Sequence, residues 1–278
     1  MKKLSILLSI ILVLTFFACD NIFSTSWGVG FARKFDSSNI TVTEDNVDDW
    51  VTRGMVNSEL AFAVTESIIG KLDEGGLSSS EELALINGGV KLSVEASGIG
   101  VSIVTNALGL VESLSEIEDW EDGIDMISDI LGGIQSDFIS NNGELAADNL
   151  AVIIGHAMDP SPNTLQNGQA PYLDISYSDN ANANDVGFAM LVLVLGVIEE
   201  LPDFDFDFDD EDADFTSIID EFVGFDFGDD NKIIVTDIDN VSPKMLALAA
   251  IVNSIGTSEN LQSGMITGPI FAAFGGEE

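Results

Sequence analysis

Apolar residues recur every three or four positions along much of the chain, which is the spacing of amphipathic α-helices. One such stretch begins at Asn57-Ser58, where a helix-capping residue precedes the first apolar position, and ends at Gly75-Gly76. In the next stretch Ser79 and Glu82 have the spacing of a capping box. The pattern therefore predicts two consecutive helices. Their apolar faces contain Leu60, Val64, Ile68 and Leu72 in the first, and Leu83, Ile86, Val90 and Val94 in the second.

Further helical stretches follow. Residues 122–138 carry apolar side chains on one face and end at Asn141-Asn142-Gly143, and residues 144–157 stop before a Pro-rich sequence. Ser242 followed by Pro243 is typical of a helix start, with proline at the first helical position. Strand signals are few, because residues 172–177 and 232–238 each predict a short strand or an extended loop.

These signals predict a mostly α fold of about eight to ten helices, with at most short strands. Residues 60–70, 145–155 and 246–256 share a theme of apolar residues followed by glycine, which would suit an α-solenoid-like stack. The spacing is irregular and the tetratricopeptide signature is missing. An irregular helical bundle is therefore the first expectation, and the solenoid-like stack is the alternative.

Two strongly apolar stretches, residues 96–111 and 186–198, raise the question of membrane spans. At ~1.5 Å per residue they reach only about 24 and 20 Å, short of the ~30 Å hydrocarbon core. Both are therefore expected to be buried central helices of a folded domain.

The N-terminus has the features of an export signal. Met1-Lys2-Lys3 precedes an apolar run over residues 4–17, and Ala18-Cys19 follows. The small residue directly before the single cysteine resembles the lipobox of bacterial lipoproteins. That resemblance implies a signal peptide over residues 1–18, lipidation of Cys19, and attachment to the cell membrane or outer membrane, facing the periplasm or the cell surface. An ordinary secreted protein with one free thiol is the alternative.

Composition limits the partners of the chain. Removing the leader takes away Lys2 and Lys3 and leaves 7 basic against 48 acidic residues, a net charge of −41. Nucleic acid is excluded as a partner, because there is no basic surface to neutralise phosphates. Anionic lipid would also repel the protein, so membrane attachment would depend on the lipid on Cys19. Residues 19–42 are expected to be the lipidated cysteine and a tether, and residues 43–278 a single helical domain.

An acidic loop over residues 201–214 interrupts that domain. Pro202 is followed by alternating aspartate and phenylalanine and then by an acidic run. The spacing of these carboxylate residues partly matches that of a calcium-binding EF-hand loop, but Phe208 occupies the position where that loop needs glycine. The interpretations left open are weak divalent-cation (calcium) binding, a solvated loop whose phenylalanines pack on the helices, and docking onto a basic partner groove. The candidate ligands are Asp203, Asp205, Asp207, Asp209 and Asp214.

Most of the common enzyme motifs are absent from the sequence. Gly70-Lys71 lacks the other residues of a P-loop, and neither a Gly-x-Ser-x-Gly elbow nor a Ser-x-x-Lys pair occurs. The single histidine, His156, is expected to be a capping or half-buried residue near a helix C-terminus, although it could orient a serine or ligate a metal. Carboxylate pairs carry little information, because with 48 acidic residues almost any spacing arises by chance.

The sequence therefore favours an exported, lipid-anchored envelope protein that is not an enzyme. Its expected role is a binding or scaffolding module for another protein or ligand, with the acidic loop and residues 157–183 as contact surfaces. No cofactor is expected except calcium at residues 203–214, and a calcium-binding protein is the first alternative function. A carboxylate-based hydrolase acting on envelope glycans is the second.

Overall fold

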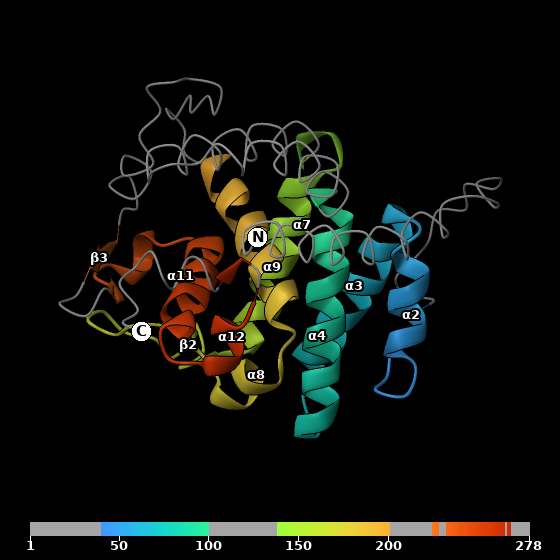
Figure 1. Ribbon diagram of the computed structural model, residues 1–278, viewed down its shortest axis with the longest axis horizontal. Coiled ribbons are helices and arrows are strands. Elements are labelled where there is room, and N and C mark those ends of the chain that lie inside the picture. The colour runs from blue at the N-terminus through green and yellow to red at the C-terminus, as the bar shows by residue number, and fades with distance from the viewer. Residues whose placement is uncertain (1–39, 100–137, 201–223, 228–231, 265, 268–278) are drawn as a thin grey trace, which may run out of the picture.

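The computed structural model describes residues 40–99, 138–200, 224–227, 232–264 and 266–267, and these residues form a mostly helical bundle (Figure 1). The two strand pairs are short and antiparallel, β1 (Met158–Asp159) with β2 (Tyr172–Leu173) and β3 (Phe225–Phe227) with β4 (Ile233–Val235). The mostly α fold with short strands is confirmed. The helices are α2 (Val47–Gly54), α3 (Ser58–Glu74), α4 (Ser79–Ala96), α7 (Gly143–His156), α8 (Ile175–Asn180), α9 (Ala183–Ile198), α11 (Pro243–Ile255) and α12 (Glu259–Gln262), with the 3-10 helix η2 (Ile238–Asn240).

Most helices begin and end at the capping and terminating residues that the sequence predicts. The Asn57 side chain accepts a hydrogen bond from the backbone N–H of Leu60, and Gly75 ends α3 with a φ of +66°. Ser242 caps α11, with Pro243 at its start. The capping box of α4 is one residue earlier than expected, because Ser78 and Glu81 form it instead of Ser79 and Glu82. The run of serines at 78–80, followed by two glutamates, gives the right spacing in both registers.

The weaker predictions are only partly correct. In the stretch 172–177 only Tyr172–Leu173 is a strand, because Asp174 caps α8 and turns the chain into a helix. The stretch 232–238 contains β4 and then the beginning of η2. Residues 186–198 do form a buried helix within α9, whereas 100–111 and 122–137 lie outside the described residues. Across the ranges that the structure covers, no helix is both long and apolar enough to cross a bilayer.

Two adjacent glycines bring three helices onto α4 at its middle. A Cβ atom on Gly88 would lie 2.6 Å from Val47 Cγ2 of α2, and one on Gly89 would lie 2.7 Å from Ile153 Cδ1 of α7. Ile68 of α3 lies 3.3 Å from the same Gly89 position and is completely buried. The missing side chains therefore allow α2, α3 and α7 to approach the α4 backbone closely. Because these helices share one apolar core, the described part of the chain is a bundle.

A buried lysine joins the C-terminal half of the bundle. Lys244 at the start of α11 is only 2% exposed, and its Nζ lies 2.8 Å from Asp148 Oδ1 of α7 and 3.0 Å from Glu200 Oε1, just after α9. Burial lowers the pKa of Lys244, but the hydrogen bonds to the two carboxylates outweigh burial and raise the pKa above its ordinary value. Gly196 of α9 makes room for this arrangement, because its Cβ would lie 3.2 Å from Lys244 Cδ and 2.5 Å from Ala147 Cβ.

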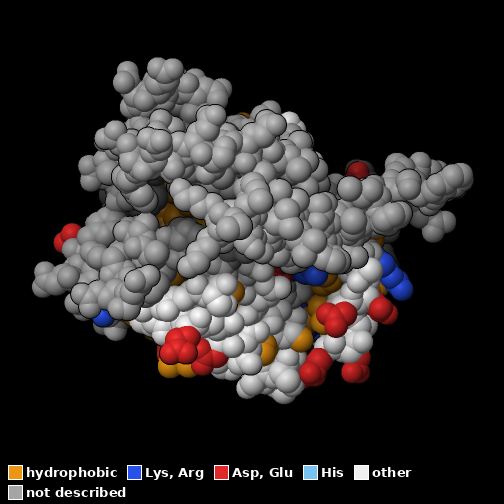
Figure 2. Space-filling model, viewed as in Figure 1, with side chains coloured by type: hydrophobic (Ala, Val, Ile, Leu, Met, Phe, Trp, Pro, Cys, Tyr) orange, Lys and Arg blue, Asp and Glu red, His pale blue; other side chains and the backbone are white. Residues whose placement is uncertain are grey.

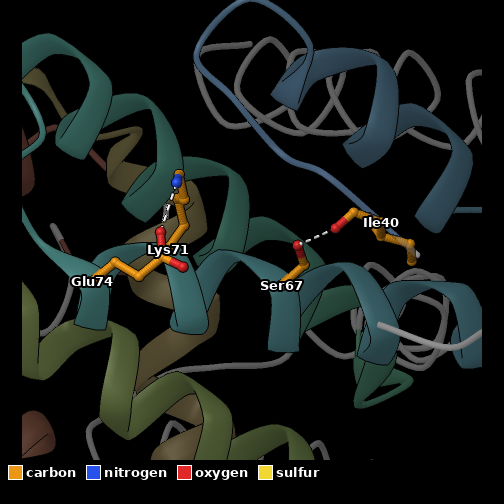
Figure 3. Close-up of polar contacts among 4 residues, drawn as sticks. All are labelled: Ile40, Ser67, Lys71 and Glu74. Carbon is orange, nitrogen blue, oxygen red and sulfur yellow. Dashed lines mark hydrogen bonds and ion pairs between the residues drawn. The ribbon is translucent and has the colours of Figure 1, made fainter. Parts of the chain in front are cut away.

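The segment before α2 is already part of the folded body. The Ser67 hydroxyl of α3 donates a 2.8 Å hydrogen bond to the carbonyl oxygen of Ile40, close to the exposed Lys71–Glu74 ion pair on the same helix (Figure 3). Ile40 and Val42 are 8% and 2% exposed. The packed body therefore includes residues 40–42, which were expected to belong to the tether.

Gly196→Ala should destabilise the protein by about 1–3 kcal/mol, because the added methyl group overlaps the rigid Ala147 Cβ and forces α7 and α9 apart. Gly70→Ala is the matched control. Gly70 is an exposed glycine inside α3, and a Cβ added there would have no atom within 4 Å, so the change should be neutral or stabilising by about 0.5–1 kcal/mol. Urea unfolding followed by circular dichroism measures both. Equal stability of the two variants would show that α7 and α9 are not tightly packed at Gly196.

Candidate functional site

A pocket of about 390 Å³ lies where α4 begins and α7 ends. Its volume falls in the usual range of small-ligand sites. Four elements surround it: the first turns of α4, the C-terminal end of α7, strand β1 and the start of α8. The polar lining residues are Ser79, Glu82, His156, Asp159, Asp174 and Ser176. The apolar or aromatic lining residues are Leu83, Ile86, Ala157, Met158 and Tyr177.

A short hairpin brings the two aspartates to the pocket. Strand β1 pairs with β2, with Met158 opposite Leu173, and the backbone N–H of Asp174 donates a 2.7 Å hydrogen bond to the carbonyl oxygen of Ala157. These contacts place Asp159 and Asp174 close to each other although fourteen residues of sequence separate them. Within the stretch 157–183, expected as a contact loop, residues 157–159, 174, 176 and 177 line the pocket.

Asp174 also starts α8. Its Oδ1 accepts a 2.7 Å hydrogen bond from the backbone N–H of Ser176, so the carboxylate is an N-cap as well as a pocket group. The following turn places Tyr177 among the lining residues, where it is 3% exposed. One short sequence, residues 174–177, thus supplies three of the lining side chains.

His156 is the last residue of α7 and is 25% exposed, which confirms the expected half-buried position at a helix C-terminus. Its Nε2 lies 3.1 Å from Asp73 Oδ1 at the end of α3. This contact ties the ends of two helices together beside the pocket. The hydroxyls of Ser79 and Ser176 are in the same wall, but neither makes a hydrogen bond with His156 in the described structure. The arrangement is not that of a serine nucleophile with its base.

Glu82, Asp159 and Asp174 give the pocket a negative potential. None of the three has a Lys or Arg partner among the residues with described positions, whereas Lys71 is paired with Glu74. Asp159 and Asp174 are exposed, and Glu82 is half-buried. Figure 2 shows the same excess of acid on the visible surface, with acidic side chains grouped at the edge where α2 lies and basic ones at fewer places.

Tyr177 also carries a buried polar group. Its hydroxyl has no hydrogen-bond partner in the described structure. Burial, and then the negative charge of Asp185 on α9, raise the pKa of this hydroxyl, so it stays neutral and can act as donor or acceptor. A buried hydroxyl without a partner is costly in free energy, and such groups are rare in folded proteins.

The pocket includes only some of the residues singled out from the sequence. Cys19 and the candidate calcium ligands Asp203, Asp205, Asp207, Asp209 and Asp214 lie outside the described residues. Within the described ranges, no three His, Cys, Asp or Glu side chains are grouped so that they could hold a metal ion. Of the pocket residues, His156 was weighed as a single functional residue, residues 157–183 were expected as a contact surface without a named ligand group, and Ser79 and Glu82 were expected only as a capping box. The chain carries no motif that joins Glu82, Asp159 and Asp174, because they come together through packing.

Asp185→Asn should raise the melting temperature at neutral pH. Burial raises the pKa of the Asp185 carboxyl, with Lys91 offsetting part of the shift, so the folded state carries an ionised group that is better solvated in the unfolded chain. As the pH falls through the raised pKa towards the ordinary value of 3.8, the folded wild-type protein takes up the proton first and the advantage of the variant should shrink. Thermal melts from pH 7.5 downwards test this, with the exposed Asp179→Asn as control. A difference in melting temperature between Asp185→Asn and the wild type that stays constant with pH would contradict this prediction.

Comparison of the chain with known protein families, with curated proteins and with solved structures found no match in any of the three.

Proposed function

We propose that the protein is an exported, lipid-anchored binding protein that takes up a small ligand in the pocket between α4, α7, β1 and α8, without catalysis. The observation that carries the proposal is the pocket itself. It combines a volume of about 390 Å³, several apolar lining residues and several polar groups that have no ion-pair partner in the described structure. Apolar walls with a few convergent polar groups are typical of small-ligand sites.

The hydrogen bonds that the polar lining groups already make support a binding site over a catalytic site. The imidazole of His156 is held by Asp73, and Asp174 is held by the α8 backbone, so both have structural roles at the wall. The wall also belongs to regular elements, with α4 and α7 held together at Gly89 one turn away from it. A preformed wall of this kind lowers the ordering cost of binding.

The proposed export and membrane attachment are supported by the sequence alone. Lys2 and Lys3, the apolar run over residues 4–17 and Ala18 before Cys19 support export and lipid attachment at that cysteine. The large negative charge supports the same proposal indirectly, because anionic lipid repels the protein and the attachment then needs a covalent lipid. Two or more acyl chains would give stable attachment.

Cys19→Ala should release the protein from membranes, because it removes the thiol that would carry the lipid. In cells grown with an alkyne-tagged fatty acid, the wild-type protein should become labelled and pellet with the membrane fraction. The variant should be unlabelled and should lose most of its membrane association. A wild-type protein that is soluble and unlabelled would support ordinary secretion and contradict the anchor.

Ser79→Trp should block the pocket, because Ser79 is an exposed lining residue at the start of α4 and a large side chain there projects over the wall. Ser80→Trp is the matched control, since Ser80 is exposed on the same turn and does not line the pocket. A melting-temperature screen of the mature protein in non-ionic detergent would use amines, amino acids, sugars and nucleotides as probes. A stabilising probe should lose its effect on Ser79→Trp and keep it on Ser80→Trp. Stabilisation that survives in both variants would place the ligand site elsewhere.

A further inference from the structure

We infer that Asn142 is a site of spontaneous covalent modification, where loss of the side-chain amide converts the residue to aspartate or isoaspartate. Asparagine reacts in this way most readily before glycine, because glycine has no side chain to hinder attack by its backbone nitrogen. The sequence contains three such pairs, Asn87-Gly88, Asn142-Gly143 and Asn167-Gly168. The hydrogen bonds of the folded protein leave the pair at 142–143 available and protect the other two.

The reaction needs only the chain and water. The backbone nitrogen of Gly143 loses its proton to solvent base and attacks the side-chain carbon Cγ of Asn142. A C–N bond forms, the bond from Cγ to the amide nitrogen breaks, and that nitrogen takes up a proton and leaves as ammonia. The product is a five-membered succinimide ring. Water then opens the ring at one of its two carbonyl carbons, which gives aspartate or, where the main chain now runs through the side chain, isoaspartate.

Gly143 supplies a backbone nitrogen that is free to react. It is the first residue of α7, and the N–H groups of the first helical turn have no acceptor within the helix. Among the described residues, none accepts a hydrogen bond from the Gly143 N–H. Deprotonation of this nitrogen therefore breaks no hydrogen bond of the described fold.

The side chain of Asn142 is also available. Asn142 is exposed and directly precedes α7, but its side chain makes no capping hydrogen bond to the helix. Its φ of +57° and ψ of +43° are a left-handed conformation, which is less favourable for a residue with a Cβ atom than for glycine. Rotation about ψ brings Cγ to the Gly143 nitrogen, at the cost of the 3.2 Å hydrogen bond from the N–H of Ala146 to the Asn142 carbonyl oxygen. Bonds at helix ends open more readily than bonds in a helix interior.

Asn167-Gly168 is exposed but is held by two hydrogen bonds. The Gly168 N–H donates a 2.7 Å hydrogen bond to the carbonyl oxygen of Val235, and Asn167 Oδ1 accepts a 2.8 Å hydrogen bond from the N–H of Ile238. Both the attacking nitrogen and the attacked side chain are therefore engaged. Exposure alone would favour reaction at Asn167, whereas the hydrogen bonds favour reaction at Asn142.

Asn87-Gly88 is protected by its position in the middle of α4. The N–H of an interior helical residue is bonded to the carbonyl oxygen four residues before it, so reaction there requires the helix to open. Gly88 is also buried where Val47 of α2 approaches α4. This pair should therefore react only when the bundle unfolds.

Modification changes the junction between residues 138–140, which are helical, and α7. Phe138 is 1% exposed, and its ring lies directly against Gly143, where an added Cβ would overlap it. Isoaspartate adds one carbon atom to the main chain within the two-residue link 141–142, so this contact cannot be kept unchanged. Aspartate instead adds a negative charge at the N-terminus of α7, where the helix dipole favours it. The two products should have opposite effects on stability.

Peptide mass spectrometry of the mature protein in non-ionic detergent tests the inference. The protein is kept at mildly alkaline pH, once folded and once in concentrated urea. Modification of Asn87, Asn142 and Asn167 is followed by the mass gained when NH2 is replaced by OH, and electron-transfer fragmentation identifies isoaspartate. In urea the three sites should react at similar rates. In the folded protein Asn142 should react at least about fivefold faster than Asn167, because Asn167-Gly168 must first lose its hydrogen bonds.

Equal rates at Asn142 and Asn167 in the folded protein would overturn the inference. It would also be overturned if Asn142 stayed unmodified in the folded protein under conditions that modify it in urea.

Asn142→Gly tests the effect on the junction, because glycine keeps the left-handed conformation and has no amide to lose. Wild-type protein aged until isoaspartate has accumulated should melt at a lower temperature than fresh protein, whereas the aged variant should melt like the fresh variant. Asn142→Asp carries the charge without the longer main chain and should melt at or above the wild-type temperature. An equal loss in aged wild type and aged Asn142→Gly would show that modification of Asn142 does not disturb the junction.

Discussion

The close approach of helices at Gly88 and Gly89 is the constraint on which the rest of the bundle depends. Without a Cβ atom at these positions, α2 and α3 approach α4 at Gly88, and α3 and α7 approach it at Gly89. The same contact determines the geometry of the pocket. Ile86 is one turn before Gly89 on α4, and His156 is one turn after Ile153 on α7. The two turns that line the pocket therefore continue directly from the close contact of α4 with α7 at Gly89.

Lys244, Asp148 and Glu200 have a similar role at the other end of α7. There the helices are held by ion pairs instead of by close packing at a glycine. The lysine is buried while Asp148 and Glu200 remain partly exposed, so solvent screens the two carboxylates and the cation pays most of the desolvation cost. The main effect of Lys244 is to fix the positions of the segments that it joins. One ammonium group is bonded to residues from two other segments, and this holds the start of α11 against α7 and the end of α9.

Local features were predictable from the sequence, and features that depend on packing were not. Asn57, Gly75 and Ser242 act through hydrogen bonds or dihedral angles within a few residues, so their positions alone predicted helix ends. The serine run at 78–80 shows the limit of this approach, because two registers satisfy the same local rule. Asp174 was missed as a cap because the apolar alternation around it favoured a strand, and the helix that it starts has only six residues.

The candidate site shows the same limit more strongly. Glu82, Asp159 and Asp174 are ordinary among 48 acidic residues until the β1–β2 hairpin and the α4–α7 contact bring them around one pocket. Tyr177 becomes notable only through the burial of its hydroxyl, which no local pattern indicates. The acidic segment at 203–214 stood out for the opposite reason, since its composition is unusual within twelve residues.

The docking of Ile40 onto Ser67 has a mechanical consequence. Residues 40–42 are held against both α2 and α3. Ser67 donates to the carbonyl oxygen of Ile40, Asn46 Nδ2 and Trp50 Nε1 donate to that of Thr41, and Ile40 and Val42 are buried. Tension applied ahead of residue 40 therefore acts on α2 and α3 together. α3 ends at Asp73 and Glu74, beside the His156 contact, so the same helix connects the point where force enters with the wall of the pocket.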